Sequence, residues 1–233
     1  MRVVSLVPSA TESLLALGVE PVACTRFCDQ PGIPTIGGTK DPDLAAVVAL
    51  GPDLVVVNDE ENRREDASAL ETAGLALHSM SLRSVHAVGA EVCALADRAG
   101  APEPERFVAS AWAALLAAWS RPAAGRAVVC VWRRPWMLAS PDTYGASVLA
   151  LLGWEVVVPA GTRRYPEVTL GAIGALDPDL VVLPSEPYRF GARHVAEAHD
   201  RVPGARVTRV DGRDLFWWGT RTPDAIARLA AML

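Results

Sequence analysis

The segment Pro-Asp-Leu-Val-Val occurs twice in the chain, at residues 52–56 and again at 178–182. Each copy follows a helical pattern and a turn, and each begins an aliphatic run that is typical of a buried strand. A second pair of similar segments, residues 16–20 and 151–155, precedes the two copies in the same order. One such match is a common way to enter a strand, whereas two in the same order predict two related α/β lobes.

Short strands alternate with helical patterns in both halves of the chain, and Ser9 or Thr11 is expected to cap the first helix. The predicted strands are residues 2–6, 22–25, 54–57, 75–80, 127–132, 155–158 and 180–183. This alternation is the βαβ pattern of parallel sheets. The predicted fold class is therefore α/β, with two Rossmann-like lobes that contain parallel sheets.

A single long helix is predicted between the two halves, from Pro102 to Trp119. The prolines and glutamates at 102–105 suit a helix N-terminus, and Arg121-Pro122 suits its exit. The predicted domains are an N-terminal α/β lobe at 1–100, a connecting backbone helix at 101–122 and a C-terminal α/β lobe at 123–233.

Composition excludes several classes of protein. The 22 basic and 27 acidic residues give a net charge of −5, and Lys40 is the only lysine, which disfavours nucleic acid as a partner. The longest strongly apolar stretch, residues 107–119, is shorter than the roughly 20 residues that a membrane span needs, so no membrane insertion is expected. No export signal precedes the first strand. The sequence as it stands therefore predicts a cytoplasmic protein with reduced cysteines, or a periplasmic or cell-surface protein if the chain has been trimmed.

Motifs for catalysis are weak. The chain has no Gly-x-Ser-x-Gly elbow and no phosphate-binding glycine loop. The spacing of His194 and His199 puts them on different helix faces, and a structural role is expected for all four histidines. The sequence therefore predicts a binding protein with no catalytic residues, no metal ligands and no intrinsic cofactor.

Ligands of parallel α/β sheets gather beyond the carboxyl ends of the strands, and this rule selects the candidate ligand-binding residues. In the first half these are Ser9, Phe27, Cys28, Gly38, Thr39, Lys40 and Asn58. In the second half they are Trp132, Arg133, Trp136, Tyr144, Tyr188, Trp217 and Trp218. Several tryptophans at strand ends predict a flat aromatic surface for a large planar ligand.

The repeat also relates two acidic residues. Counted from the proline of each copy, Glu60 and Glu186 occupy the same position, one in each half, and Glu61 follows directly. Two carboxylates at equivalent strand ends could dock on basic residues of a partner or approach a bound cation.

The chain resembles the cobalamin- and iron-siderophore-binding proteins of ABC importers, also called helical-backbone metal receptors. The resemblance covers nearly the whole chain. It rests on residues 3–12, Phe27-Cys28-Asp29-Gln30-Pro31, Gly37-Gly38 with Pro42-Asp43-Leu44, 52–56, Thr143-Tyr144-Gly145 and 178–188. It implies the class III periplasmic binding protein fold, with two lobes spanned by one backbone helix.

The resemblance also implies roles for single residues. Phe27 corresponds to an aromatic residue that contacts the corrin ring, while Asn58 stands where cobalamin-binding members have a tryptophan. A glutamate on each lobe meets arginines of the permease, and in the first lobe this is Glu60, Glu61 or Glu65.

Two functions from different classes follow. The first is a substrate-binding protein that clamps a cobalamin-like corrinoid, haem or ferric siderophore between its lobes for ABC-type import. The second is a cytoplasmic, chelatase-like enzyme of tetrapyrrole or metal metabolism, which requires an acid or histidine such as His78 or His194 in the cleft.

Overall fold

The computed structural model describes residues 1–102, 109–161 and 163–233, which pack as two units. Unit 1 comprises Met1–Leu82, Ala87–Ala113 and Trp218–Arg221. Unit 2 comprises Arg83–His86, Ala114–Trp217 and Thr222–Leu233. Each unit thus consists of three separate segments of the chain. This division differs from the predicted one, in which the ranges 1–100, 101–122 and 123–233 follow one another.

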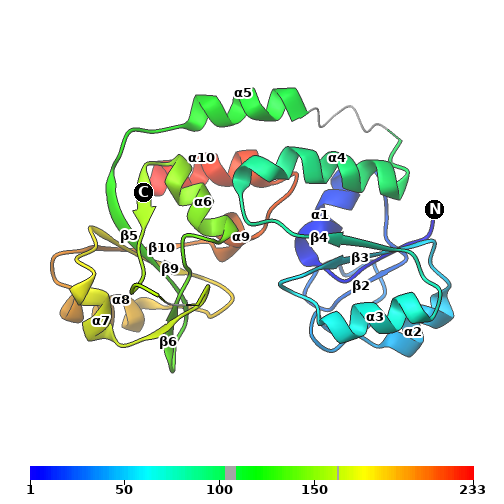
Figure 1. Ribbon diagram of the computed structural model, residues 1–233, viewed down its shortest axis with the longest axis horizontal. Helices are drawn as coiled ribbons and strands as arrows, with labels where there is room; N and C mark the ends of the chain where they lie inside the picture. Colours follow the sequence, from blue (N-terminus) through cyan, green and yellow to red (C-terminus); the bar gives the residue numbers. More distant parts are fainter. Residues whose placement is uncertain (103–108, 162) are drawn as a thin grey trace. The chain divides into compact units, whose positions relative to one another are not determined.

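Unit 1 is built on a parallel sheet (Figure 1). Its strands are β1 (Val3–Ser5), β2 (Ala23–Cys24), β3 (Leu54–Asn58) and β4 (Leu77–Met80), in the order β2-β1-β3-β4. Each lies within a segment predicted to be a strand, except that β3 extends one residue beyond its predicted end. The central strands β1 and β3 are buried along their whole length, which is why they read as continuous aliphatic runs without alternation.

The helices of unit 1 cover both faces of this sheet, α1 and α4 on one face and α2 and α3 on the other (Figure 1). They are α1 (Pro8–Ala16), α2 (Leu44–Leu50), α3 (Arg64–Thr72) and α4 (Val88–Ala99), with a short 3₁₀ turn, η1 (Val85–Ala87), before α4. Asp43 caps α2 by accepting a hydrogen bond from the backbone N–H of Ala46. The predicted cap of α1 by Ser9 or Thr11 is wrong. Val7 occupies that position without a side-chain bond, because Pro8 opens the helix and lacks an N–H to satisfy.

Unit 2 has a mixed sheet (Figure 1). Its strands are β5 (Gly125–Trp132), β6 (Trp136–Leu138), β7 (Trp154–Val156), β8 (Glu167–Val168), β9 (Leu180–Pro184) and β10 (Arg206–Val210). The parallel part is β7-β5-β9-β10, and its strands β7, β5 and β9 overlap predicted strands, whereas β10 was not predicted. The strands β6 and β8 extend it by antiparallel pairing, which the sequence analysis did not anticipate, since it predicted no strand between residues 132 and 155 and none between 158 and 180.

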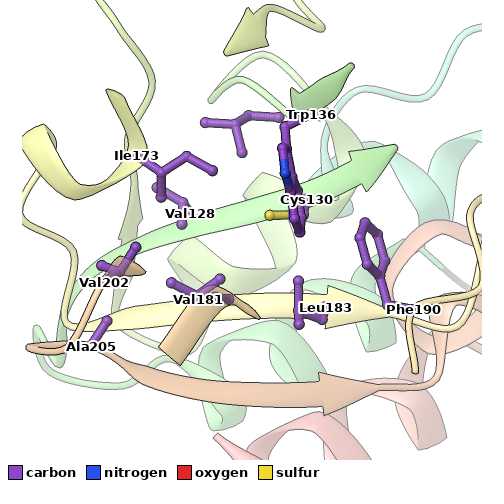
Figure 2. Packing of buried hydrophobic residues seen from close by; sticks show 11 residues of the cluster. Val128, Cys130, Trp136, Ile173, Val181, Leu183, Phe190, Val202 and Ala205 are labelled. Carbon is purple, nitrogen blue, oxygen red and sulfur yellow. The ribbon is translucent and has the colours of Figure 1, made fainter. Parts of the chain in front are cut away.

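Helices α7 (Leu170–Ala175) and α8 (Ala192–Arg201) pack together beside this sheet, and α6 (Tyr144–Leu151), α9 (Gly212–Phe216) and α10 (Thr222–Met232) form a second group (Figure 1). The core under α7 and α8 contains Val128 and Cys130 of β5 and Val181 and Leu183 of β9. Figure 2 shows the rings of Trp136 and Phe190 side by side at one end of this core. Aromatic packing therefore continues from the buried core to the carboxyl end of β5.

The two Pro-Asp-Leu segments make the same contacts in their own units. Asp53 Oδ2 accepts a hydrogen bond from the N–H of Arg2 at 2.6 Å, and Asp179 Oδ2 accepts one from the N–H of Arg126 at 2.8 Å. In return, the N–H groups of Asp53 and Asp179 donate to the carbonyls of Arg2 and Arg126. Each aspartate thus joins the start of β3 or β9 to the start of the neighbouring β1 or β5. The strand orders β2-β1-β3-β4 and β7-β5-β9-β10 correspond, which confirms the two related lobes.

Helix α5 (Ala109–Trp119) is the described part of the predicted connecting helix, and the division between the units falls within it, after Ala113. Residues 103–108 of that prediction lie outside the described residues. Trp112 is buried because Gly89 of α4 leaves room for it: a Cβ on Gly89 would lie 2.7 Å from the indole. Within the described ranges, no helix is both long and apolar enough to cross a membrane.

Candidate ligand-binding faces of the two units

Phe27 is an exposed aromatic residue of unit 1, with 52% of its surface accessible. It follows β2 in a turn closed by a hydrogen bond from the N–H of Cys28 to the carbonyl of Thr25. The guanidinium carbon of Arg26 lies 4.9 Å from the centre of the Phe27 ring, and Arg26 is in turn paired with Asp41 at 3.0 Å. A Cβ on Gly38 would collide with both side chains of this ion pair, which would have to shift to make room for it. The predicted residues Phe27 and Gly38 therefore belong to one local structure.

Cys28 and Ser9 lie beneath this surface. Each is only 2% exposed, and Cys28 Sγ lies 3.2 Å from the hydroxyls of both Thr11 and Thr25. All four cysteines are free, as expected, and burial, with a smaller contribution from Cys28, raises the pKa of Cys24 to about 12. Ser9 Oγ has no hydrogen-bond partner within the described residues. Cys28 thus packs in the interior of unit 1, and ligand contact by either residue stays a prediction.

Asn62, which the sequence analysis did not select, organises the carboxyl edge of this sheet. Its Nδ2 donates to the carbonyls of Leu6, after β1, and Thr39, in the glycine loop, at 3.1 and 3.0 Å. Its Oδ1 accepts the N–H of Asn58 at 2.8 Å. One buried amide therefore joins three segments that are far apart in the sequence.

Asn58 and Lys40 also shape the loop after β3. The side chain of Asn58 is buried, and its Oδ1 accepts hydrogen bonds from the N–H groups of Glu60 and Glu61. Lys40 is exposed and donates to the carbonyl of Glu60 at 2.7 Å. The Oδ1 atom of Asn58 therefore closes an Asx turn in this loop. Ligand contact by Asn58 stays a prediction.

Unit 2 presents a supported aromatic face at the carboxyl ends of β5 and β9. Trp132 is 43% exposed, and its ring meets the edge of Tyr188 at 5.4 Å between centroids. Tyr188 rests on Phe190 at 4.8 Å, and Phe190 stacks on Trp136 at 5.7 Å. Phe190 was not selected as a ligand-binding residue; it follows β9 by six residues and is fully buried. We call Trp132, Trp136, Tyr188 and Phe190 the aromatic cluster.

Charged groups fix the rim of this cluster. Arg133 makes two hydrogen bonds to Glu197 of α8, from Nε at 3.0 Å and Nη2 at 2.6 Å, and its guanidinium lies 5.1 Å from the centre of the Trp136 ring. His194 is 4% exposed and stands edge-on to Tyr188. Its Nδ1 accepts the N–H of Gly191, which agrees with the structural role expected for this histidine.

The other aromatic candidates lie elsewhere. Tyr144 is buried in unit 2, where its hydroxyl is 2.9 Å from that of Thr222. Trp218 is buried and belongs to unit 1, which the assignment to a second lobe at 123–233 did not foresee. Trp217 is half-buried, with Arg213 stacked 4.9 Å from its ring centre. The structure therefore gives Tyr144 and Trp218 packing roles, because tertiary contacts bury them, and their contact with ligand stays a prediction.

The two glutamates related by the repeat occupy equivalent positions. Glu60 lies two residues after the end of β3, and Glu186 lies two residues after the end of β9. Glu60, Glu61 and Glu186 are all half-buried. In the part of the chain that the structure describes, no group of three or more His, Cys, Asp or Glu residues is placed to hold a metal ion.

Comparisons with known proteins agree with this architecture. The vitamin B12-binding protein of Salmonella choleraesuis is 25% identical over 192 residues, which cover 78% of this chain and 71% of the relative. That of Vibrio campbellii is 21% identical over 203 residues, covering 83% and 71%. No protein-family model matches the chain.

Solved structures decide the fold. The periplasmic vitamin B12-binding protein BtuF of Vibrio cholerae superposes with a TM-score of 0.83 at 18% identity, covering 99% of this chain and 95% of its own. The chain has the fold of these periplasmic binding proteins. The periplasmic haem-binding protein HutB of the same organism gives a TM-score of 0.80, covering 99% and 98%. The predicted class III fold and the resemblance to cobalamin- and siderophore-binding proteins are thus confirmed.

Proposed function

We propose that this protein is a substrate-binding protein that holds a metal-containing small molecule, a corrinoid, haem or ferric chelate, for ABC-type import. The relatives named above are binding proteins, two of them periplasmic, and none is an enzyme. A delivery role for an importer also places the protein outside the cytoplasm. The comparisons offer no support for the chelatase-like alternative.

The observation that carries this proposal is the aromatic cluster of unit 2. The exposed Trp132 is held at a fixed angle by Tyr188, which Phe190 and Trp136 support from below. A rigid exposed aromatic loses little conformational entropy on binding, and large planar ligands bury much apolar area against it. Phe27 of unit 1 offers a second exposed ring, steadied by Arg26. Each unit therefore presents an exposed aromatic ring of its own.

Replacing Trp132 by alanine is expected to weaken binding at least about tenfold, because buried aromatic contacts commonly cost more than about 1–2 kcal/mol when truncated. The measurement is an absorption and calorimetric titration of the purified protein with cyanocobalamin, dicyanocobinamide, haemin and a ferric siderophore. Trp119 of α5 is half-buried and precedes the amino end of β5, whereas Trp132 lies at its carboxyl end, so Trp119→Ala is the matched control and should bind normally. Failure of all four ligands to bind the unmodified protein would refute the proposed function.

We propose further that Glu60, with Glu61, and Glu186 dock on arginines of the importer permease. Their equivalent positions after β3 and β9 support this pairing of one acidic site per unit. The double variant Glu60→Lys, Glu186→Lys should stimulate the ATPase of the cognate importer in proteoliposomes at least about tenfold less well, because reversed charges repel across an interface. Its affinity for ligand should stay unchanged. Glu155→Lys on β7 is the control. Equal stimulation of the ATPase by the unmodified protein, the double variant and this control would exclude this docking mode.

A further inference from the structure

Three polar side chains of unit 2 converge beside the aromatic cluster. The Nε2 atom of His194 lies 3.4 Å from the hydroxyl oxygen of Tyr188 and 3.2 Å from Nε of Arg193. Arg193 and His194 belong to the first turn of α8, and Tyr188 precedes that helix by four residues. We call Tyr188, Arg193 and His194 the donor corner.

A count of protons shows that donors outnumber acceptors in the donor corner. The N–H of Gly191 donates to His194 Nδ1 at 2.9 Å, so the neutral imidazole must carry its proton on Nε2. Arg193 Nε also carries a proton and therefore cannot donate to Nε2, despite the short distance. The Tyr188 oxygen is the one acceptor among the three groups, whereas Nε2, Arg193 Nε and the Tyr188 hydroxyl bring three donor hydrogens. Because Arg193 is exposed and Tyr188 is half-buried, the hydrogens on Arg193 Nε and on the Tyr188 hydroxyl are open to an acceptor from outside the chain.

The electrostatics of the corner favour a negatively charged acceptor. The pKa of His194 is lowered, first by burial and then by the positive charges of Arg193 and Arg133, so the ring is neutral near pH 7. Glu197, the carboxylate that opposes this shift, already accepts two hydrogen bonds from Arg133. Arg193 is exposed and brings a full positive charge at the positive end of the α8 dipole. A carboxylate would therefore receive charge-assisted hydrogen bonds here.

The position of the corner ties it to the proposed ligand, so this inference rests on the proposed function. The ring of Tyr188 contacts Trp132 on one side and His194 on another, with both centroids 5.4 Å away. A planar ring system on Trp132 would therefore lie near the ring of Tyr188, whose hydroxyl belongs to the donor corner. We propose that the donor corner is a subsite for a carboxylate on the rim of a planar ligand, as a haem propionate is, and that it selects such ligands over rings that carry only amides or esters.

The test compares haemin, haemin dimethyl ester and dicyanocobinamide on the protein and on Arg193→Gln. Haemin should bind the unmodified protein at least about tenfold more tightly than its ester, as expected for a charge-assisted bidentate contact. Arg193→Gln should remove this preference by weakening haemin alone. Arg189→Gln, an exposed arginine between Tyr188 and Phe190, is the matched control and should keep the preference. Equal binding of acid and ester, or an equal loss of both in Arg193→Gln, would overturn the subsite.

A second measurement separates the subsite from the proposed function. Indole-3-propionate should shift the side-chain ¹⁵N resonance of His194 Nε2, whereas indole-3-propionamide and the Arg193→Gln variant should show no such shift. If haemin, its ester and cobinamide all fail to bind but the propionate shift is present, the proposed function fails and the carboxylate subsite stands. If the macrocycles bind and neither the ester comparison nor the propionate probe shows a preference, the subsite is wrong and the proposed function stands.

Discussion

Replacing Asn62 by leucine is expected to lower the free energy of unfolding of unit 1 by about 3–5 kcal/mol. Leucine has a similar shape but removes the bonds to Leu6, Thr39 and Asn58, which leaves three backbone groups without this partner. A buried group left unsatisfied costs about 1–3 kcal/mol. Amide hydrogen exchange, resolved for β3 and for β9, measures the loss and assigns it to unit 1.

Arg63→Leu is the control for this experiment. Arg63 is the next residue, exposed, and makes no side-chain bond at the start of α3, so its replacement should change stability by less than about 0.5 kcal/mol. A loss below about 1 kcal/mol for Asn62→Leu would show that water replaces the amide at no great cost. The same variant should loosen the loop that carries Glu60, because Asn62 fixes the backbone of Asn58 on which that loop depends.

Replacing Phe190 by alanine is expected to destabilise unit 2 by about 3–5 kcal/mol, the usual cost of truncating a fully buried phenylalanine. The cavity would also remove the support of Tyr188 and the stacking partner of Trp136 (Figure 2). Ligand affinity should fall with stability, since Trp132 depends on Tyr188 for its orientation. Urea denaturation with hydrogen exchange of β9, together with the ligand titration, measures both effects.

The matched control is the same substitution at an exposed phenylalanine. Phe27→Ala removes a ring that is 52% accessible and should change the free energy of unfolding by less than about 1 kcal/mol. Similar losses for the two variants would contradict the assignment of Phe190 to a tightly packed core.

The central strands of both sheets were predictable because the sequence signals for them are local. A strand buried on both faces needs an aliphatic run, and the turns before β3 and β9 need the Pro-Asp pair that joins them to β1 and β5. The helices α2 and α6 carry their own capping residues, Asp43 and Thr143, directly before their first helical residue. These features depend on neighbours within a few residues or on a repeated pattern.

The candidate site was less predictable, because its organisation is tertiary. Nothing near Asn62 in the sequence shows that its amide would reach Leu6, 56 residues away. Phe190 and His194 resemble ordinary core residues until the structure places them behind Tyr188. Conversely, Trp218 and Tyr144 are residue types suited to a ligand, and their burial follows from contacts that no local pattern records. Exposed aromatics such as Trp132 were found because they directly follow a strand.

The bond that each Pro-Asp segment makes to the neighbouring strand also bears on the history of the chain. Asp53 and Asp179 hold the same backbone group of the strand beside them, at corresponding places in two sheets of the same strand order. A doubled ancestral half would leave this trace, with its framework kept in both copies. The differences between the two halves lie at the strand ends, where one half has the antiparallel strand β6 with Trp136 and the other a turn bearing Phe27. The two halves therefore share the strand order and the aspartate bonds between neighbouring strands, and they differ in the loops at their strand ends.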